Sequence, residues 1–442
     1  MSSPSDGALR KPGPTSGPWA PPGRRSRRFD ERLVLRVGLG LSAVFVAVAI
    51  AAFALPSVVH GSWAGLHLAL AGAAMVAIGT FMPHFGVTLA GSQAEPASLR
   101  LGGVLALAAG AALVVIGIVT QAVGVTVPGA GLLWLGLAIT AWTTLRPGLR
   151  PLARRHPIAQ LAYAVALLEV AIGISLPVLL LLGWEPAVAG WGRLKPAHVW
   201  LNLFGFVSLT ISATLVYLYP TIVGARIRAQ PSLALMVGGG MVGPPLVAAG
   251  AIIGAPPVAV VGAAITLIGA AGQVAYALDA WRRRGRWTTD AGWHRLTVGH
   301  LSAAMAWYLV AVASAAVGIV NDGPAPADWS LGALAVPLVA GWSLQVLVGA
   351  WTHLLPAVGS MEPARRAQQR SVLGAAALPR LVAWNAGALL GWVGLATGIL
   401  PMAIVGMALF VSATAVVIVL LVRALWPAGQ SGAHGAIRHG ST

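Results

Sequence analysis

Long apolar runs recur along almost the whole chain and constrain its fold more than any motif does. A transmembrane helix needs roughly 20 mostly apolar residues to cross the bilayer core. Of the 442 residues, 57% are hydrophobic and only 9% are charged, so one soluble core could not bury the apolar surface. We therefore expect an all-α membrane protein with about twelve transmembrane helices. Their centres lie near Val44, Val76, Val114, Gly136, Glu169, Leu209, Met241, Leu267, Trp307, Trp342, Gly391 and Met407.

Arginine is concentrated in alternate loops between these runs, which sets the expected orientation. Positively charged loops stay on the cytoplasmic side of a membrane. The sequence therefore predicts a multi-pass protein of the cell membrane, surrounded by the lipid bilayer, with both termini in the cytoplasm. This asymmetry accounts for the net charge of +17, and we expect no nucleic-acid partner. The basic loop residues are Arg24, Arg25, Arg27, Arg28, Arg146, Arg150, Arg154, Arg155, Arg226, Arg228, Arg282, Arg283, Arg284, Arg286, Arg365, Arg366 and Arg370.

Two short polar ends flank the membrane domain. Residues 1–30 are rich in Pro, Ser, Gly and Arg, a composition typical of a disordered basic cytosolic tail. Residues 31–426 form the predicted twelve-helix domain, and residues 427–442 form a second cytosolic tail. The first apolar run is long enough to remain as a span, so we expect no cleavable signal peptide.

Three prolines in similar contexts indicate an internal repeat. Pro83, Pro220 and Pro356 are separated by 137 and 136 residues, and each lies near the cytoplasmic end of a long apolar run. A near-constant period indicates one structural unit used several times. We expect three four-helix repeats, at about residues 31–150, 151–290 and 291–426, with the proline helices lining the interior. The alternative for the prolines themselves is a repeated helix terminator.

Histidines provide the candidate metal ligands, because the chain has ten of them and no cysteine. His67 and His198 lie near the outer ends of the second and sixth predicted helices. His84 and His353 lie toward the cytoplasmic side. Imidazole suits haem iron and copper, so the specific hypothesis is a redox-metal site. The alternative is that these histidines are ordinary interfacial residues near helix ends.

The spacing of the histidines limits which of them share a metal. His67 and His84 are 17 positions apart, about 25 Å along a helix, so they cannot bind one ion. His198 lies 22 residues before Pro220, whereas His67 lies 16 residues before Pro83. That difference corresponds to about 9 Å of helical rise, so we expect a broad haem to accept both histidines more readily than a small ion.

Two further features mark the fifth and sixth predicted helices. His198, Asn202, Gly205 and Ser212 share one helix face and form a polar stripe of small residues that must face other helices. Ordinary helix packing also explains such a stripe. Glu169 lies near the middle of the fifth span, where an ionisable group is costly. We expect it to face the interior, either as a proton relay or as a protonated structural residue.

Three segments resemble a known family. The run from His198 to Pro220 resembles the His-x-His-Leu-Asn-x-x-Gly-Phe stretch of proteins related to subunit I of haem–copper oxidases and nitric oxide reductases. It is also similar to the NnrS group and to actinobacterial membrane regions joined to multicopper oxidase or nitrite reductase domains. The other two segments of the actinobacterial type match residues 67–72 with 83–85, and 345–349 with 353–356.

The resemblance implies a haem–copper-oxidase-like fold and a cofactor of haem b, copper or both. It implies His67 and His198 as metal ligands, with His84 and His353 as further cofactor-binding residues. The chain departs from the family where Trp200 replaces the second histidine of the motif. Residues 230–254 also contain no histidine. A bimetallic reducing centre of the family type would need those ligands.

Three classes of function therefore remain open. The first is a haem- or copper-binding redox protein linked to nitric oxide, nitrite or copper metabolism, with a redox partner in the periplasm or elsewhere outside the cytoplasm. The second is a transporter or permease, since internal repeats are common in that class. The third is a non-catalytic membrane subunit that anchors a separate soluble copper enzyme. Visible absorption by haem or copper in the purified protein would separate the first class from a transporter.

Overall fold

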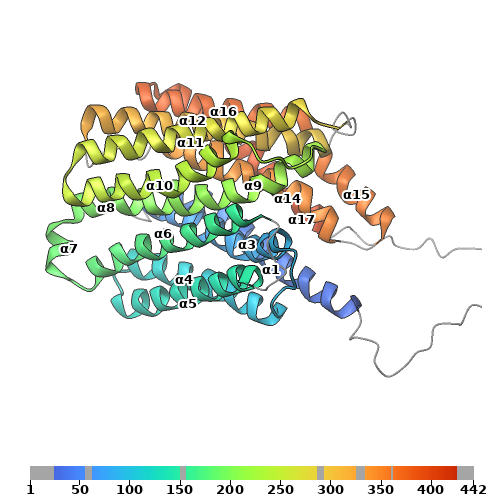
Figure 1. Ribbon diagram of the computed structural model, residues 1–442, viewed down its shortest axis with the longest axis horizontal. Helices are drawn as coiled ribbons and strands as arrows, with labels where there is room; N and C mark the ends of the chain where they lie inside the picture. The colour runs from blue at the N-terminus through green and yellow to red at the C-terminus, as the bar shows by residue number, and fades with distance from the viewer. Residues whose placement is uncertain are drawn as a thin grey trace, which may run out of the picture.

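The protein is a bundle of long helices (Figure 1). The computed structural model describes residues 24–54, 62–149, 156–285, 293–324, 334–359 and 362–425, and these ranges contain no β-strand. The predicted all-α class is confirmed. The helices are α1 (Arg24–Ala54), α2 (Ser62–His67), η1 (Leu68–Ala74), α3 (Met75–Ala90), α4 (Ala97–Val119), α5 (Val123–Leu145), η2 (Arg146–Leu149), α6 (Pro157–Leu181), α7 (Glu185–Ala189), α8 (Trp191–Val199), η3 (Trp200–Val207), α9 (Ser208–Val223), α10 (Pro231–Ile253), α11 (Pro256–Arg282), α12 (Trp293–Asp322), η5 (Val336–Ser343), α14 (Leu344–Gly359), α15 (Pro363–Gly374), α16 (Ala377–Thr397) and α17 (Leu400–Leu425).

Eleven helices among the described residues are long and apolar enough to cross a membrane. The bent pair α15 and α16, whose axes differ by 43°, supplies a twelfth span if it is counted as one. The expected number of about twelve is therefore confirmed, and the chain is a multi-pass membrane protein. The span predicted around Gly391 lies in α16, the longer member of the bent pair.

The first helix begins earlier than the predicted boundary at residue 31. Helix α1 starts at Arg24, so part of the expected tail is helical. No glycine or proline follows until Gly38, and the helix meets no breaker in its first turns. Residues 1–23 and 427–442, which belong to the two predicted tails, lie outside the described residues.

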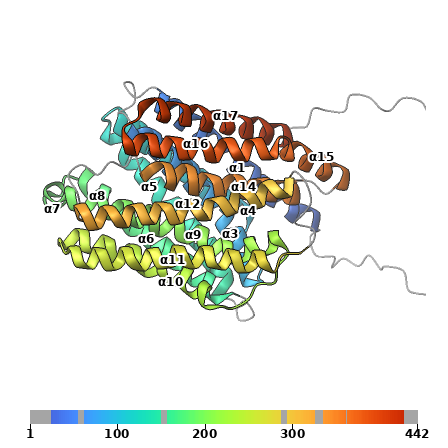
Figure 2. The same cartoon turned by 90° about the horizontal axis from the view of Figure 1, so that it is seen from above.

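Three helix pairs are packed through glycine: α4 with α5, α10 with α11, and α16 with α17. A Cβ on Gly239 would lie 2.5 Å from the Cα of Gly269, and one on Gly406 would lie 2.2 Å from the backbone nitrogen of Gly391. Small residues let helix backbones approach this closely in membranes. Figure 2 shows α10 with α11 and α16 with α17 at opposite edges of the bundle, while α4 and α5 run along the lower side of Figure 1.

The spans that contain Pro83, Pro220 and Pro356 form the interior. Within an apolar 18-residue window of each of these spans, 67%, 78% and 72% of the residues are buried, compared with at most 56% in the other eight candidate spans. Segment η1 contacts η5, and α3 contacts α9. The predicted interior position of these three helices thus agrees with their burial.

Each of the same three spans passes through a π-helical stretch: η1, η3 or η5. Such stretches are rare in proteins overall, but many of those known lie at functional sites. They change the direction of side chains and leave backbone carbonyl groups without their usual helical hydrogen bonds. Ser208 Oγ donates to the carbonyl of Leu203 (2.7 Å), and Ser343 Oγ donates to that of Leu338 (3.0 Å). This recurrence is compatible with the threefold repeat, which remains a prediction.

Candidate functional site

His67 and His198 come together near one end of the bundle. His67 ends α2 immediately before η1, and His198 is the next-to-last residue of α8, two positions before η3 begins. Their ring centres are 6.5 Å apart, and the ring planes differ by 15°. Trp63 covers one face of the His67 ring, with ring centres 4.0 Å apart. The structure therefore pairs the two histidines that the sequence predicts as metal ligands.

His67 and His198 are close together although the residue counts predicted that they lie at different depths along their helices. Counting back from Pro83 and Pro220 places His67 and His198 about 9 Å apart in depth, if every residue adds 1.5 Å of rise. That expectation is wrong, because it assumes that Pro83 and Pro220 lie at the same depth. The π-helical stretches in the two intervals have 7 and 8 residues and shorten both by a similar amount, so packing rather than proline position sets how the two helices align.

The Nδ1 atom of each histidine ring lies within hydrogen-bond distance of a backbone carbonyl oxygen. The Nδ1 of His67 lies 2.8 Å from the carbonyl oxygen of Trp63, and the Nδ1 of His198 lies 2.8 Å from that of Gly173. A carbonyl oxygen only accepts, so each of these contacts assigns the proton to Nδ1. The Asn202 amide nitrogen lies 3.1 Å from His198 Nδ1 and, with that proton in place, donates only to the backbone oxygen of His198. In the neutral ring, the Nε2 atom then keeps its lone pair. Metal-binding histidines commonly have this second hydrogen bond, which fixes the tautomer and the ring orientation.

The pair offers two nitrogen ligands to a metal. With metal–nitrogen bonds of about 2 Å, two imidazoles that bind one ion from opposite sides have ring centres roughly 6 Å apart. The observed 6.5 Å is close to that value. Among the described residues, no group of three or more histidine, aspartate or glutamate side chains is placed to hold a metal. His67 and His198 would therefore be the residues to hold haem iron or a copper ion at this point, and the metal would supply one-electron chemistry.

Trp200 occupies the position where the family motif has a second histidine. Its side chain is fully buried and stacks on Phe204, with ring centres 4.1 Å apart and planes inclined by 21°. Helix α10 contains no histidine either. No family model matches the chain, and no curated protein is similar to it. The resemblance to haem–copper oxidases and the NnrS group thus remains an expectation from short motifs.

Glu169 lies deep in the bundle at the middle of α6. It is 2% exposed, and neither carboxyl oxygen has a hydrogen-bond partner among the described residues. Its carboxyl group packs against Gly205 of η3, where a Cβ would lie 2.6 Å from Glu169 Oε2. A buried carboxylate without a partner is unfavourable, so the group carries a proton or awaits a cation.

One helix contact joins Glu169 to the histidine pair. Gly173 lies one turn beyond Glu169 on α6, about 6 Å along the axis. Its carbonyl accepts from His198, and the Asn202 side chain fills the space where a Cβ on Gly173 would project. The Asn202 amide also donates to the backbone oxygen of His198 (2.7 Å). The face of η3 that carries the predicted polar stripe therefore runs along α6 from the histidine to the carboxyl group.

Two aromatic residues that the sequence did not single out as site residues complete this region. Tyr308 of α12 stacks on Trp342 of η5, with ring centres 4.8 Å apart. The Trp342 indole donates to Ser208 Oγ (3.0 Å), and Tyr308 lies close enough to Glu169 for the two groups to interact electrostatically. In the sequence, these residues appear only as aromatic residues with a polar O–H or N–H group inside an apolar span. Ordinary helix packing produces the same pattern, so it did not mark them as site residues.

The structure does not bring His84 to His67 or to His198. Its Nδ1 lies 3.1 Å from Glu31 Oε1, and Arg100 of α4 forms an ion pair with the other oxygen of Glu31. These three residues link α1, α3 and α4 at the end of the bundle opposite the histidine pair. An ion-pair cluster explains His84 without a cofactor.

His353 contacts a different histidine. Its ring meets that of His294 on α12, with ring centres 6.4 Å apart and planes inclined by 72°. His294 Nε2 donates to the carbonyl of Ile222 (2.8 Å). The inner candidates therefore belong to two separate clusters and do not form one site.

His300 is a buried histidine that is not among the predicted ligands. It is fully buried on α12, and neither ring nitrogen has a hydrogen-bond partner among the described residues. Its ring meets the edge of Trp384 at 5.6 Å, and Gly349 of α14 packs against its Cβ. These contacts include none of the predicted ligands.

Proposed function

We propose that this membrane protein binds one redox metal, as haem b iron or as a copper ion, between His67 and His198. The supporting observation is the pairing of the two rings: they are nearly parallel, their centres are 6.5 Å apart, and each Nδ1 is committed to a backbone carbonyl. Residues from α2 and α8, 131 positions apart in sequence, would share the ion. The site would belong to the part of the membrane opposite the arginine-rich loops.

Bound there, haem iron or copper would supply one-electron transfer. The carbonyls of Trp63 and Gly173 hold the two imidazoles in the ligand tautomer, and Trp63 shields one ring face from solvent. Among the described residues only two histidines meet at this point, so we propose electron transfer or metal handling in nitric oxide, nitrite or copper metabolism. A redox partner on the outer side, or a soluble copper enzyme anchored there, would exchange electrons with the site.

Glu169 would serve this site as a proton-carrying group. It lies one helical turn from Gly173, and Gly173 accepts the hydrogen bond of the ligand His198. Because the carboxyl group has no hydrogen-bond partner among the described residues, taking up or losing a proton would break no such bond. When a buried metal gains or loses an electron, the electrostatic free energy of the change is smallest if a nearby group takes up or releases a proton at the same time.

Metal content and visible absorption of the purified protein test this proposal. Cells supplied with copper and a haem precursor should yield protein with close to one equivalent of either metal. His67→Ala and His198→Ala should each remove most of it, because a two-ligand site loses half its donors with either change. His84→Gln is the matched control, since His84 contacts Glu31 at the opposite end of the bundle and this variant should keep the metal.

Two results would contradict the metal site. One is wild-type protein that contains neither haem nor copper under these growth conditions. The other is wild-type metal content in both alanine variants. Either result would leave His67 and His198 as packing residues near the membrane surface.

A proton-coupled transporter is the second candidate, and Glu169 is the observation that favours it. A carboxyl group that is 2% exposed in mid-membrane and lacks a hydrogen-bond partner among the described residues is suited to binding and releasing a proton or cation. This class predicts colourless, metal-free protein. It also predicts that Glu169→Gln abolishes proton uptake into proteoliposomes while His67→Ala does not.

A further inference from the structure

Two polar side chains occupy adjacent notches in the contact between α6 and η3. The Glu169 carboxyl group fills the space beside Gly205, where a Cβ would lie 2.6 Å from Glu169 Oε2. The Asn202 side chain fills the space beside Gly173, where a Cβ would lie 2.8 Å from Asn202 Oδ1. Gly173 follows Glu169 by one turn of α6, and Gly205 follows Asn202 by three residues of η3. The two side chains therefore lie next to each other between the same two segments.

The oxygen atoms of these two side chains are not used in hydrogen bonds. Both carboxyl oxygens of Glu169 are buried without a partner among the described residues. The Asn202 amide nitrogen donates to the backbone oxygen of His198 (2.7 Å), which identifies the other end of the amide group as Oδ1. Among the described residues, this Oδ1 atom accepts no hydrogen bond. Buried polar groups are almost always satisfied, and a bound ion satisfies oxygen atoms of this kind.

No charged side chain of the surrounding elements balances an ionised Glu169. Segments α5, η3, α9 and α10 pack against α6 and contain no acidic, basic or histidine side chain. The charged and histidine side chains of α3, α7 and α8, which also contact α6, lie toward the two ends of the bundle: His84, Glu185, Arg193, Lys195 and His198. The tyrosines of α6 and α9 lie toward the end that contains Pro220: Tyr163, Tyr217 and Tyr219. Tyr308 of α12 is the titratable side chain that approaches the carboxyl group. An ionised carboxylate at this depth therefore needs a cation from outside the chain.

The available ligands and the single negative charge select the kind of cation. Hard cations bind carboxylate, amide and backbone carbonyl oxygens. Irregular helices in membrane transporters bind sodium ions through their carbonyl groups, and η3 is a π-helical segment of this kind. One carboxylate balances one positive charge in a dry interior, so a divalent ion would keep an uncompensated charge. We propose that Glu169, Asn202 and the backbone carbonyl groups of η3 bind one sodium ion.

The sodium ion and the proton would compete for the same carboxyl group. Without sodium, Glu169 carries a proton. When sodium binds, the O–H bond breaks and the proton leaves to the solution, so the site stays neutral in both states. This part of the inference rests on the proton-carrying role proposed above for Glu169. It needs neither haem nor copper, so protein without either metal would contradict the metal site and still permit the sodium measurement.

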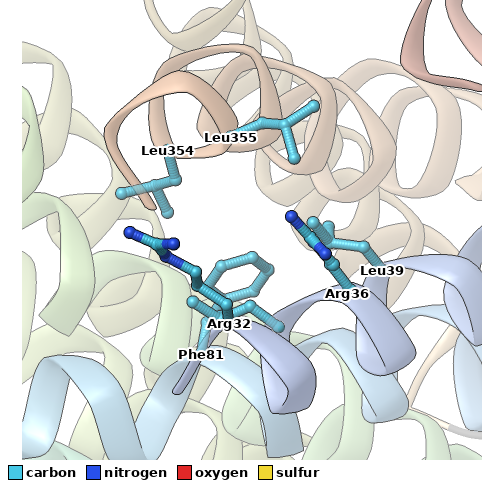
Figure 3. Close-up of a pocket in the computed structure, with 7 residues that line it drawn as sticks. Arg32, Arg36, Leu39, Phe81, Leu354 and Leu355 are labelled. Atoms are coloured by element: carbon cyan, nitrogen blue, oxygen red, sulfur yellow. The ribbon is translucent and has the colours of Figure 1, made fainter. Parts of the chain in front are cut away.

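The hollow between α1, α3 and α14 is not an alternative place for a cation (Figure 3). Two arginines, Arg32 and Arg36, line it together with five apolar side chains, so its side chains offer no oxygen ligand. A cation there would meet positive charge. Sodium-specific effects should therefore depend on Glu169.

Thermal unfolding of the full chain in detergent tests the inference. Equal concentrations of sodium, potassium and choline chloride keep the ionic strength constant. Sodium should raise the unfolding temperature above the values in potassium and choline, because a ligand that binds the folded state stabilises it. Radioactive sodium should bind with close to one ion per protein. Each ion bound should release one proton into a weakly buffered solution.

Two variants and a matched control locate the ion. Glu169→Gln should weaken sodium binding about tenfold or more and release no proton, because it removes the charge that balances the ion. Asn202→Leu keeps the volume of the side chain but removes its oxygen, and should weaken binding without abolishing proton release. Glu95→Gln is the control: it removes another buried carboxylate, one that is paired with Arg146, and should keep the sodium response.

Three results would overturn the inference. The first is wild-type protein that unfolds at the same temperature in all three salts. The second is a sodium response that persists in Glu169→Gln. The third is an equal loss of the response in Glu95→Gln, which would assign the effect to general charge. The first result would leave Glu169 as a group that binds only the proton.

Discussion

The carboxyl group of Glu169 lies against the backbone of Gly205, in the space that any larger residue would need for its Cβ. That Cβ would come within 2.6 Å of Glu169 Oε2. Helices α6 and η3 thus approach closely at the depth of the only acidic residue in α6. Substitutions at Gly205 and Glu169 can therefore test how tightly the helices pack and whether the carboxyl group is protonated.

We expect Gly205→Ala to destabilise the protein and to displace the Glu169 side chain. The added methyl group overlaps the carboxyl group and costs about 1 to 3 kcal/mol, the usual range for overpacking. Unfolding by SDS titration measures this cost. Gly40→Ala is the matched control, because nothing lies within 4 Å of a Cβ there, and it should be as stable as wild type or slightly more stable. Equal behaviour of the two variants would contradict the close contact.

Glu169→Gln should change stability by less than about 1 kcal/mol, because a buried carboxyl group without a partner carries its proton and glutamine has its shape and charge. Glu169→Lys should prevent accumulation of folded protein, since the ammonium group would have no counter-charge in the bundle. SDS titration and membrane-inserted yield are the measurements. A loss of several kcal/mol in Glu169→Gln would show that the folded protein needs the ionised carboxylate and a cation beside it.

Two adjacent glycines on α10 should respond in opposite ways to alanine. Gly239 faces the backbone of Gly269 on α11. A Cβ on Gly239 would lie 2.5 Å from the Cα of Gly269, so Gly239→Ala forces the two helices apart. We expect a loss of about 1 to 3 kcal/mol in SDS titration. Gly238 has open space around its Cβ position, so Gly238→Ala should be neutral or slightly stabilising. Similar losses in both variants would mean that backbone freedom, not packing, sets the cost.

The arginine distribution predicts that both termini and the loop after α11 lie in the cytoplasm. Reporter fusions after Arg286 and after Asp322 should therefore report opposite sides of the membrane. Helix α12 ends at Asp322 and is itself a candidate span, so its two ends must differ in location if it crosses. The same side for both fusions would reject this topology.

Much of the fold follows from the sequence because a bilayer imposes simple rules. Apolar length sets the spans, since backbone polar groups in lipid must be satisfied within helices. The intervals between Pro83, Pro220 and Pro356 marked the three spans that the structure buries most deeply. The prediction failed at the start of α1, where composition indicated a tail and the helix begins at Arg24.

The candidate site was only partly readable from the sequence. The sequence singled out His67, His198 and Glu169 because polar groups inside apolar runs are costly and therefore conspicuous. It could not show that His84 binds Glu31 or that His353 meets His294, because those partners lie on other helices. Tyr308 and Trp342 were missed for the same reason.

The sequence by itself determined the class of protein, the spans and the set of polar groups within them, because these depend on composition and local order along one chain. Only the tertiary structure decided which polar groups meet. His67 and His198 face each other at 6.5 Å although residue counts put them at different depths. Helix alignment is set by side-chain packing between segments far apart in sequence, and π-helical stretches change the rise within each helix.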